Sequence, residues 1–173
     1  MTSTSPRLET GPFVLCAPHE RAPKPRRMGT TDGLGDRMRT AAFAELQAVQ
    51  AFAWAADHFD DVPAELRTAW RALVPDEQRH LDAILGRMVE LALAVDARPV
   101  SAGLWQALVG CASGRDFGLL IASAEERGRQ SAIRLAGYLG TRDPTTATVF
   151  ATIADEERAH VALASQYLGR APV

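Results

Sequence analysis

The sequence predicts an all-α fold in which four long helices pair into two antiparallel hairpins joined by a long crossover. Two observations lead to this prediction. Aromatic residues make up only 6% of the chain, and alanine and leucine are frequent, a composition that favours helices over strands. Each half of the chain also carries a Glu that is followed, 32 residues later, by a Glu-x-x-His motif, which indicates an internal repeat of two helical hairpins.

The chain divides into two predicted parts. Residues 1–35 are rich in proline and glycine and show no apolar period, so we expect an extended or poorly ordered arm. Residues 36–173 are predicted to form the helical bundle, a length that can bury a sizeable core. The basic segment 21–27 could touch a phosphate or an acidic partner, but simple solvation is the expected state of such a segment.

The first hairpin is predicted from an apolar stripe and a turn. Its first helix is predicted to begin near Asp36, a suitable N-cap, and to run to about Phe59, with apolar residues in a stripe along one face. The stripe consists of Met38, Ala42, Glu45, Val49, Phe52, Ala56 and Phe59. Glu45 is its only charge, and a carboxylate on a core face is costly unless it is paired, hydrogen-bonded or bound to metal. The second helix runs from Pro63 to about Val95, with a kink or short break expected at Pro75.

The second hairpin follows a connection at 96–114, in which a short helical turn is expected around 104–109. Its first helix is predicted over 115–139, with Gly140 well placed as the C-cap. The chain then turns, and a last helix is predicted to run to about Leu168.

The spacing of the Glu residues supports the pairing of the helices. Glu45 lies 14 residues before the end of its helix, and Glu77 lies 14 residues after the start of the next one. Both stretches climb about 21 Å at about 1.5 Å per residue, so an antiparallel hairpin brings the two carboxylates to the same height. The corresponding separations for Glu125 and Glu157 are 14 and 13 residues.

Both motifs place a Glu three residues before a His on one helix face, where the two side chains can hold the same metal ion or two adjacent ones. The candidate metal ligands are Glu45, Glu77, His80, Glu125, Glu157 and His160. Four carboxylates and two imidazoles suit iron or manganese better than a soft metal, and the carboxylates balance the charge of two divalent ions. The pattern predicts a site for two iron ions, with manganese or a mixed pair as alternatives.

Two questions about neighbouring residues stay open in the sequence. Only one of the adjacent Glu125 and Glu126 can point inward; the 32-residue repeat favours Glu125, whereas aligning the apolar residues of the two halves favours Glu126. Asp76 and Glu156 each precede a ligand Glu and are candidates to accept a hydrogen bond from the His of the other hairpin. Arg79 is a candidate partner for one of them, and a solvated helix face is the alternative for all three.

Over about 36–168 the chain resembles the ferritin-like di-iron carboxylate superfamily. The segments Glu45-Leu-Gln-Ala-Val, Asp76-Glu-Gln-Arg-His80 and Asp155-Glu-Glu-Arg-Ala-His160 are most similar to an uncharacterised bacterial ferritin-like family. Glu125-Glu-Arg-Gly128 resembles a segment of that family and of the tRNA 2-methylthio-adenosine hydroxylases, in which the first Glu is the ligand. The resemblance implies a left-handed, ferritin-like four-helix bundle with a long crossover, and it adds support for Glu125.

The resemblance also implies an activity, although a fold of this kind hosts several. We expect a di-iron oxidoreductase that activates dioxygen, with an unknown substrate. The alternatives are a ferroxidase or iron-storage protein of the bacterioferritin type, which shares the ligand pattern, and a non-enzymatic bundle that only binds metal. The expected partners are dioxygen or a small-molecule substrate and an electron donor, and a homodimer is compatible with this expectation.

The remaining composition argues against other classes of protein. A net charge of −2 gives no overall attraction to nucleic acid or to an anionic membrane, and no apolar run is long enough to span one. The N-terminus lacks the apolar stretch of a signal peptide, so a cytoplasmic location is expected. Cys16 and Cys111 make no disulfide framework and are expected to be thiols. His19 and His58 are expected on the surface.

Overall fold

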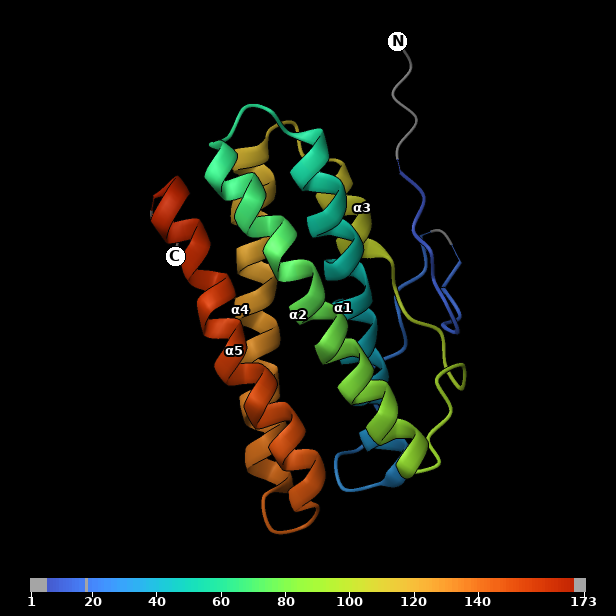
Figure 1. Cartoon of the computed structure of the whole chain (residues 1–173). Coiled ribbons are helices and arrows are strands. Elements are labelled where there is room, and N and C mark those ends of the chain that lie inside the picture. Colours follow the sequence, from blue (N-terminus) through green and yellow to red (C-terminus); the bar gives the residue numbers. More distant parts are fainter. Residues whose placement is uncertain (1–5, 18, 170–173) are drawn as a thin grey trace. The chain divides into compact units, whose positions relative to one another are not determined.

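The computed structural model describes residues 6–17 and 19–169, and within these ranges it contains five α-helices and no strand (Figure 1). The helices are α1 (Thr31–His58), α2 (Ala64–Glu90), α3 (Gly103–Val109), α4 (Gly114–Leu139) and α5 (Pro144–Leu168). The predicted all-α fold class is confirmed, and the four long helices are consistent with a four-helix bundle. The short helical turn expected in the crossover is present as α3. None of the described helices is long and apolar enough to cross a membrane.

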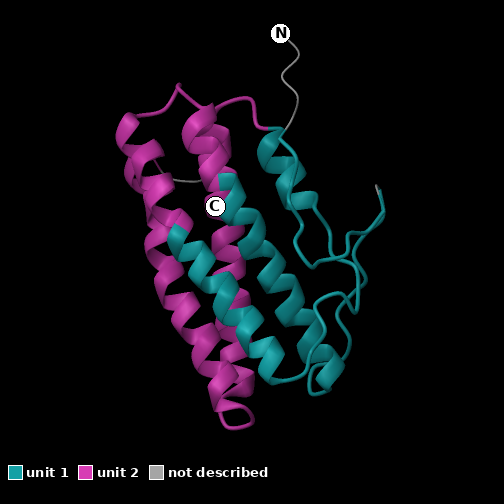
Figure 2. Cartoon of the chain, turned by 45° about the vertical axis from the view of Figure 1, so that its right-hand side comes forward, with its two compact units in different colours: residues 1–51, 75–110 teal, residues 52–74, 111–173 magenta. Residues whose placement is uncertain are grey.

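The chain folds as two compact units (Figure 2). Unit 1 is Met1–Ala51 with Pro75–Gly110, and unit 2 is Phe52–Val74 with Cys111–Val173. Two of the boundaries fall inside helices, after Ala51 in α1 and after Val74 in α2, so each unit contains a segment of both helices. The predicted division into an arm at 1–35 and a bundle at 36–173 stays a prediction.

In unit 1, buried side chains of α1, α2 and α3 form the core. They include Met38, Phe43, Ile84, Met88 and Leu108. Buried Gln47 connects α1 to α3, because its Oε1 accepts a hydrogen bond from the backbone N–H of Trp105 at 2.9 Å. That N–H belongs to the first turn of α3 and has no partner within the helix, so the amide of Gln47 supplies the acceptor that the helix start requires.

The described part of the N-terminal segment packs against the rest of unit 1. The ring of Phe13 is buried and lies 5.0 Å from that of Phe43, measured between ring centroids. The backbone N–H of Cys16 donates to Val100 O at 2.9 Å, and the N–H of Val100 donates to Val14 O at 2.8 Å. The arm is therefore joined to α1 by apolar packing and to the crossover by backbone hydrogen bonds.

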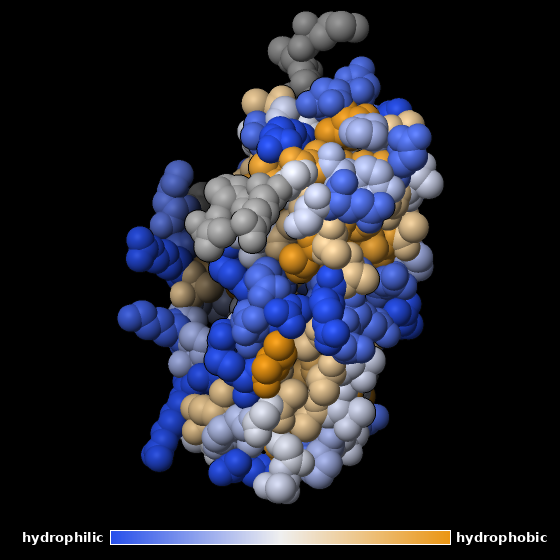
Figure 3. Space-filling view, turned by 90° about the vertical axis from the view of Figure 1, so that its left-hand side faces the viewer, coloured by the Kyte–Doolittle hydropathy of each residue, from blue (hydrophilic) through white to orange (hydrophobic). Residues whose placement is uncertain are grey.

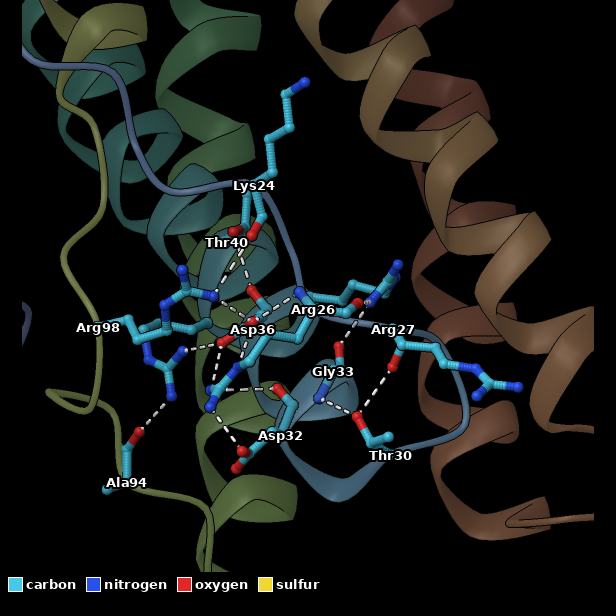
Figure 4. Close-up of polar contacts among 12 residues, drawn as sticks. Lys24, Arg26, Arg27, Thr30, Asp32, Gly33, Asp36, Thr40, Ala94 and Arg98 are labelled. Carbon is cyan, nitrogen blue, oxygen red and sulfur yellow. Dashed lines mark hydrogen bonds and ion pairs between the residues drawn. The ribbon is translucent and has the colours of Figure 1, made fainter.

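Helix α1 begins at Thr31, about one turn earlier than predicted. Thr30 Oγ1 accepts a hydrogen bond from Gly33 N at 3.0 Å, so Thr30 fulfils the capping role that we assigned to Asp36. Asp36 lies inside the helix and is buried. Its carboxylate accepts hydrogen bonds from Arg26 Nε at 2.9 Å, Arg39 Nη1 at 3.1 Å and Arg98 Nη1 at 2.6 Å (Figure 4). These contacts, led by that of Arg26, hold the pKa of Asp36 well below its usual range.

Helix α2 is continuous through Pro75, so the helix is not broken there, and the kink expected as the other possibility stays a prediction. The helix ends at Glu90 rather than near Val95, because Ala92 adopts a left-handed conformation with a φ of 53°. The N–H groups of Ala92 and Leu93 then donate to Val89 O and Met88 O, a hydrogen-bond pattern that closes a helix C-terminus.

Unit 2 is built around the packed pair α4 and α5. Ser113 caps α4 by accepting a hydrogen bond from Asp116 N, and Asp143 caps α5 by accepting one from Thr146 N, directly before Pro144. Gly140 is the C-cap of α4, as predicted, although its backbone is not left-handed. Fully buried Phe117 is surrounded by the aromatic rings of Phe52, Trp54, Phe59 and Trp70, with centroid distances from 5.1 to 6.4 Å.

The side chains that remain exposed are mostly polar. On the face shown in Figure 3, hydrophilic residues predominate and hydrophobic residues are interspersed among them. The large hydrophobic side chains that are exposed belong to Val14, Leu15, Val89 and Ile133. Cys16 and Cys111 form no disulfide, in agreement with the expectation of two thiols.

Candidate metal centre

The first Glu/His cluster lies in unit 1 and consists of Glu45 from α1 with Glu77 and His80 from α2. One ligand atom from each side chain lies within 4.8 Å of the others. His80 Nδ1 is 3.7 Å from Glu45 Oε2 and 3.8 Å from Glu77 Oε2. The i, i+3 spacing on α2 brings Glu77 and His80 to one face, and α1 supplies the third group.

The second cluster repeats this arrangement in unit 2, with Glu125 from α4 and with Glu157 and His160 from α5. One ligand atom from each again lies within 4.8 Å of the others. His160 Nδ1 is 3.5 Å from Glu157 Oε1. Each unit therefore carries one Glu and one Glu-x-x-His motif on two different helices, which is the internal repeat that the sequence spacing predicts.

Both clusters are buried. The exposed fraction is 0% for Glu77 and 3% for Glu157, and both imidazoles are buried as well. Glu45 and Glu125 retain partial exposure. Burying an ionised carboxylate costs several kcal/mol or more unless a positive charge or hydrogen bonds compensate it, so two carboxylates this deep in a helical core favour a cationic ligand.

The structure distinguishes between the two neighbouring Glu residues on α4. Glu125 belongs to the cluster, whereas the carboxylate of Glu126, with a side chain 40% exposed, accepts hydrogen bonds from Arg129 and Gln130. The hydrogen bond from Arg129 is the main reason why the pKa of Glu126 is lowered to about 2. Residues of α4 itself therefore stabilise the ionised form of Glu126.

The residues that flank the motifs also fall into a repeated pattern. Arg79 Nη1 lies 2.6 Å from Asp76 Oδ1, and Arg158 pairs with Asp155 at the same i, i+3 spacing in the other motif. Asp76 is thus the partner of Arg79 among the two that the sequence offered, and both side chains are exposed, by 38% and 56%, as on a solvated helix face. Hydrogen bonds from the His of the other hairpin to Asp76 or Glu156 stay a prediction.

The other histidines are placed as expected. His19 and His58 are exposed, and the imidazole of His58 stacks on Trp54 with a centroid distance of 4.4 Å. Trp70 and Trp105 are buried and pack in the core of their own units. These residues therefore have structural positions outside both clusters.

A pocket in unit 2, missed in the sequence analysis, adjoins the second cluster. Its lining comes from all four long helices, and every lining residue except Glu125 and His160 is apolar. Gly118 lies in its wall, where an added Cβ would come within 2.5 Å of Leu168 Cδ1 and 3.3 Å of Trp70 Cζ2. A glycine inside an apolar helical stretch was the signal that could have indicated a close approach at this position.

The donor set fits a carboxylate metal site. Carboxylate oxygens and imidazole nitrogens, without thiolates, are the ligands that iron and manganese accept. Each cluster could hold a metal ion, and all six candidate ligands from the sequence lie in one cluster or the other. Their role as ligands stays a prediction.

These features define an all-α protein with buried Glu/His groups compatible with a carboxylate metal site. The chain belongs to the family described as "Protein of unknown function (DUF455)", whose family model matches residues 2–171. No curated protein and no solved structure matches the sequence significantly.

Proposed function

We propose that the protein is a ferritin-like oxidoreductase that activates dioxygen with two bound iron ions, and that each of the two clusters supplies ligands to one ion. The observation that carries this proposal is the repetition of the ligand set: each unit presents a Glu on one helix and a Glu-x-x-His motif on another. A Glu from each of two helices plus Glu-x-x-His from each of two others is the ligand set of di-iron carboxylate bundles.

Charge balance supports two divalent ions rather than one. The carboxylates of Glu45, Glu77, Glu125 and Glu157 carry four negative charges when ionised, and two divalent cations neutralise them. A single divalent ion would leave two buried negative charges, which is costly in a low-dielectric core. Two manganese ions, or one manganese and one iron ion, would balance the same four negative charges.

The protein residues have separate roles in this proposal. Glu45, Glu77 and His80 would bind one ion, and Glu125, Glu157 and His160 the other. Ferrous ions in the site would supply electrons to dioxygen, and an electron donor would restore them. Burial in the helical core separates Glu77, Glu157 and both histidines from bulk water. The i, i+3 spacing holds each imidazole toward the carboxylate of its own motif.

An aerobic ferrous titration of the purified apoprotein tests the proposal. Iron retained after desalting should saturate at about two ions per chain, with consumption of dioxygen. His80→Ala should reduce retention to about one ion or fewer, because metal affinity depends on each ligand. His58→Ala, which changes an exposed imidazole on α1, is the matched control and should retain the wild-type amount.

The other outcomes each identify a different function. Retention of tens of ions per chain would replace the proposal with iron storage in a cage of ferritin type. Retention of about two ions without dioxygen consumption would indicate a bundle that only binds metal. If wild type and His80→Ala retained the same amount, the assignment of the ligands would be wrong.

A further inference from the structure

The apolar pocket of unit 2 reaches the second Glu/His cluster. Its lining includes Leu73 on α2, Ala122 on α4, and Leu163 on α5, and its polar groups are those of Glu125 and His160. The empty space between these side chains, with the part open to solvent included, is about 270 Å³. It is narrow, however, with room for about one water-sized molecule.

The chemistry of the lining determines which small molecules bind favourably in the pocket. A buried water molecule needs two to four polar partners, and hydrogen peroxide would leave most of its own hydrogen bonds unmade against this wall. Dioxygen is uncharged, makes no strong hydrogen bonds, and loses nothing on transfer from water to an apolar surface. Size and polarity therefore favour the same class of occupant, a small apolar gas molecule.

We propose that this pocket is the site through which dioxygen reaches the second Glu/His cluster, at Glu125 and His160, an inference that rests on the proposed function. Partial exposure of Leu163 and Glu125 places solvent contact on the α4 and α5 side of the pocket. Elsewhere in the wall, Gly118 lies so close to Leu168 and Trp70 that even one added methyl group would collide. The narrow pocket has room for dioxygen and excludes an organic substrate.

Xenon is a suitable probe, because it is apolar, small and binds dry apolar cavities in proteins. A ¹²⁹Xe NMR titration of the full-length apoprotein should show saturable binding to wild type. Leu163→Phe and the smaller change Ala122→Val should each weaken it by about tenfold or more, since both add volume to the pocket wall. Ile133→Phe, an added aromatic ring at an exposed position of the same helix α4, should leave xenon binding unchanged.

The iron-loaded protein provides the second readout. Leu163→Phe should slow the consumption of dioxygen by about tenfold while the iron retained per chain stays at the wild-type value. Leu163→Ala, which widens the pocket, should not slow it. Toluene should not bind the wild-type apoprotein; toluene binding that competes with xenon would assign the pocket to an organic molecule and overturn the proposal.

The two proposals fail in different ways. A protein that retains about two irons but shows no saturable xenon binding, or binds xenon equally well as Leu163→Phe, would overturn the dioxygen pocket alone. A protein that binds xenon as expected but retains no iron would overturn the proposed function, and the pocket would then have no metal centre to serve.

Discussion

Glu126 and Arg129 are joined by two hydrogen bonds, with Arg129 Nε and Nη2 at 2.7 and 2.9 Å from the two carboxylate oxygens of Glu126. A third hydrogen bond reaches Glu126 from Gln130 Nε2 at 2.8 Å. These contacts occupy Glu126 on α4 and leave its neighbour Glu125 to face Glu157 and His160.

The two Glu residues on α4 should therefore differ in their effect on metal binding. Glu125→Gln should reduce retained iron to about one ion per chain or fewer, because it removes a ligand charge from the second cluster. Glu126→Gln should retain the wild-type amount. Elemental analysis of desalted protein after ferrous loading measures both variants side by side. Equal losses in the two variants would contradict the assignment of Glu125.

The fully buried carboxylate of Glu77 should affect stability in opposite directions with and without metal. In the apoprotein, Glu77→Gln should raise the free energy of unfolding by about 1–3 kcal/mol, because it removes a buried charge and keeps the side-chain shape. In the presence of Mn²⁺ the same variant should be less stable than wild type, since bound metal stabilises only a protein that can hold it.

Urea unfolding with and without Mn²⁺ checks this reversal. Glu65→Gln is the matched control, because Glu65 is exposed on the same helix α2. It should change the free energy of unfolding by less than about 0.5 kcal/mol under both conditions. A Glu77→Gln variant that is destabilised in the apoprotein would show that Glu77 stabilises the fold without metal.

Asp36 should contribute a pH-dependent part of the stability. Its pKa is lowered in the folded state, so its contribution is complete above the unfolded-state pKa of about 3.9 and is lost as the pH falls toward the lowered value. Asp36→Asn should lower the free energy of unfolding by about 3 kcal/mol at neutral pH, because it removes one partner of a buried charge cluster. The difference between wild type and variant should shrink below about pH 4.

Chemical denaturation over a series of pH values measures this difference. Asp32→Asn is the control: the side chain of Asp32 is 67% exposed, and its ion pair with Arg26 should contribute less than about 1 kcal/mol. A cost of Asp36→Asn that is the same at neutral and acid pH would mean that packing, rather than charge, makes Asp36 important.

Two glycines of α4 should respond in opposite ways to the same substitution. Gly118→Ala should destabilise the protein by about 1–3 kcal/mol, because the new Cβ would collide with Leu168 and press on Trp70. Gly128→Ala, where no atom lies within 4 Å of the added Cβ, should stabilise it by about 0.5–1 kcal/mol through helix propensity.

Thermal or urea unfolding of the two variants makes the comparison. Adding Leu168→Ala to Gly118→Ala should recover part of the loss, since Leu168 Cδ1 is the nearest colliding atom. If the double variant recovered no stability, the close contact between α4 and α5 could not be the cause of the destabilisation by Gly118→Ala.

The long helices and the two clusters could be predicted from the sequence because both depend on local spacing. Helix periodicity identified the stripe around Glu45, and the i, i+3 spacing identified each Glu-x-x-His pair. The choice between Glu125 and Glu126 was not contained in local sequence, because Arg129 lies four residues after Glu125 and three after Glu126, and both spacings allow a helical ion pair.

The features that could not be predicted depend on distant parts of the chain. Asp36 looked like an N-cap, but its partner Arg98 follows 62 residues later, and no local pattern joins them. The end of α2 requires a left-handed Ala92, a conformation that sequence rules assign to glycine or asparagine. The pocket required the side chains of four helices to be in place before its apolar wall could be recognised.

The anchoring of the N-terminal arm has a practical consequence for shortening the protein. A chain begun at Thr31 would keep every helix and every candidate ligand, yet it would expose the face of Phe43 that Phe13 covers. It would also lose Arg26, whose hydrogen bond is the main reason why the pKa of Asp36 is lowered. The smallest fragment suited to recombinant production therefore starts ahead of Phe13, and protease cleavage within the arm should loosen unit 1 although it removes no helix.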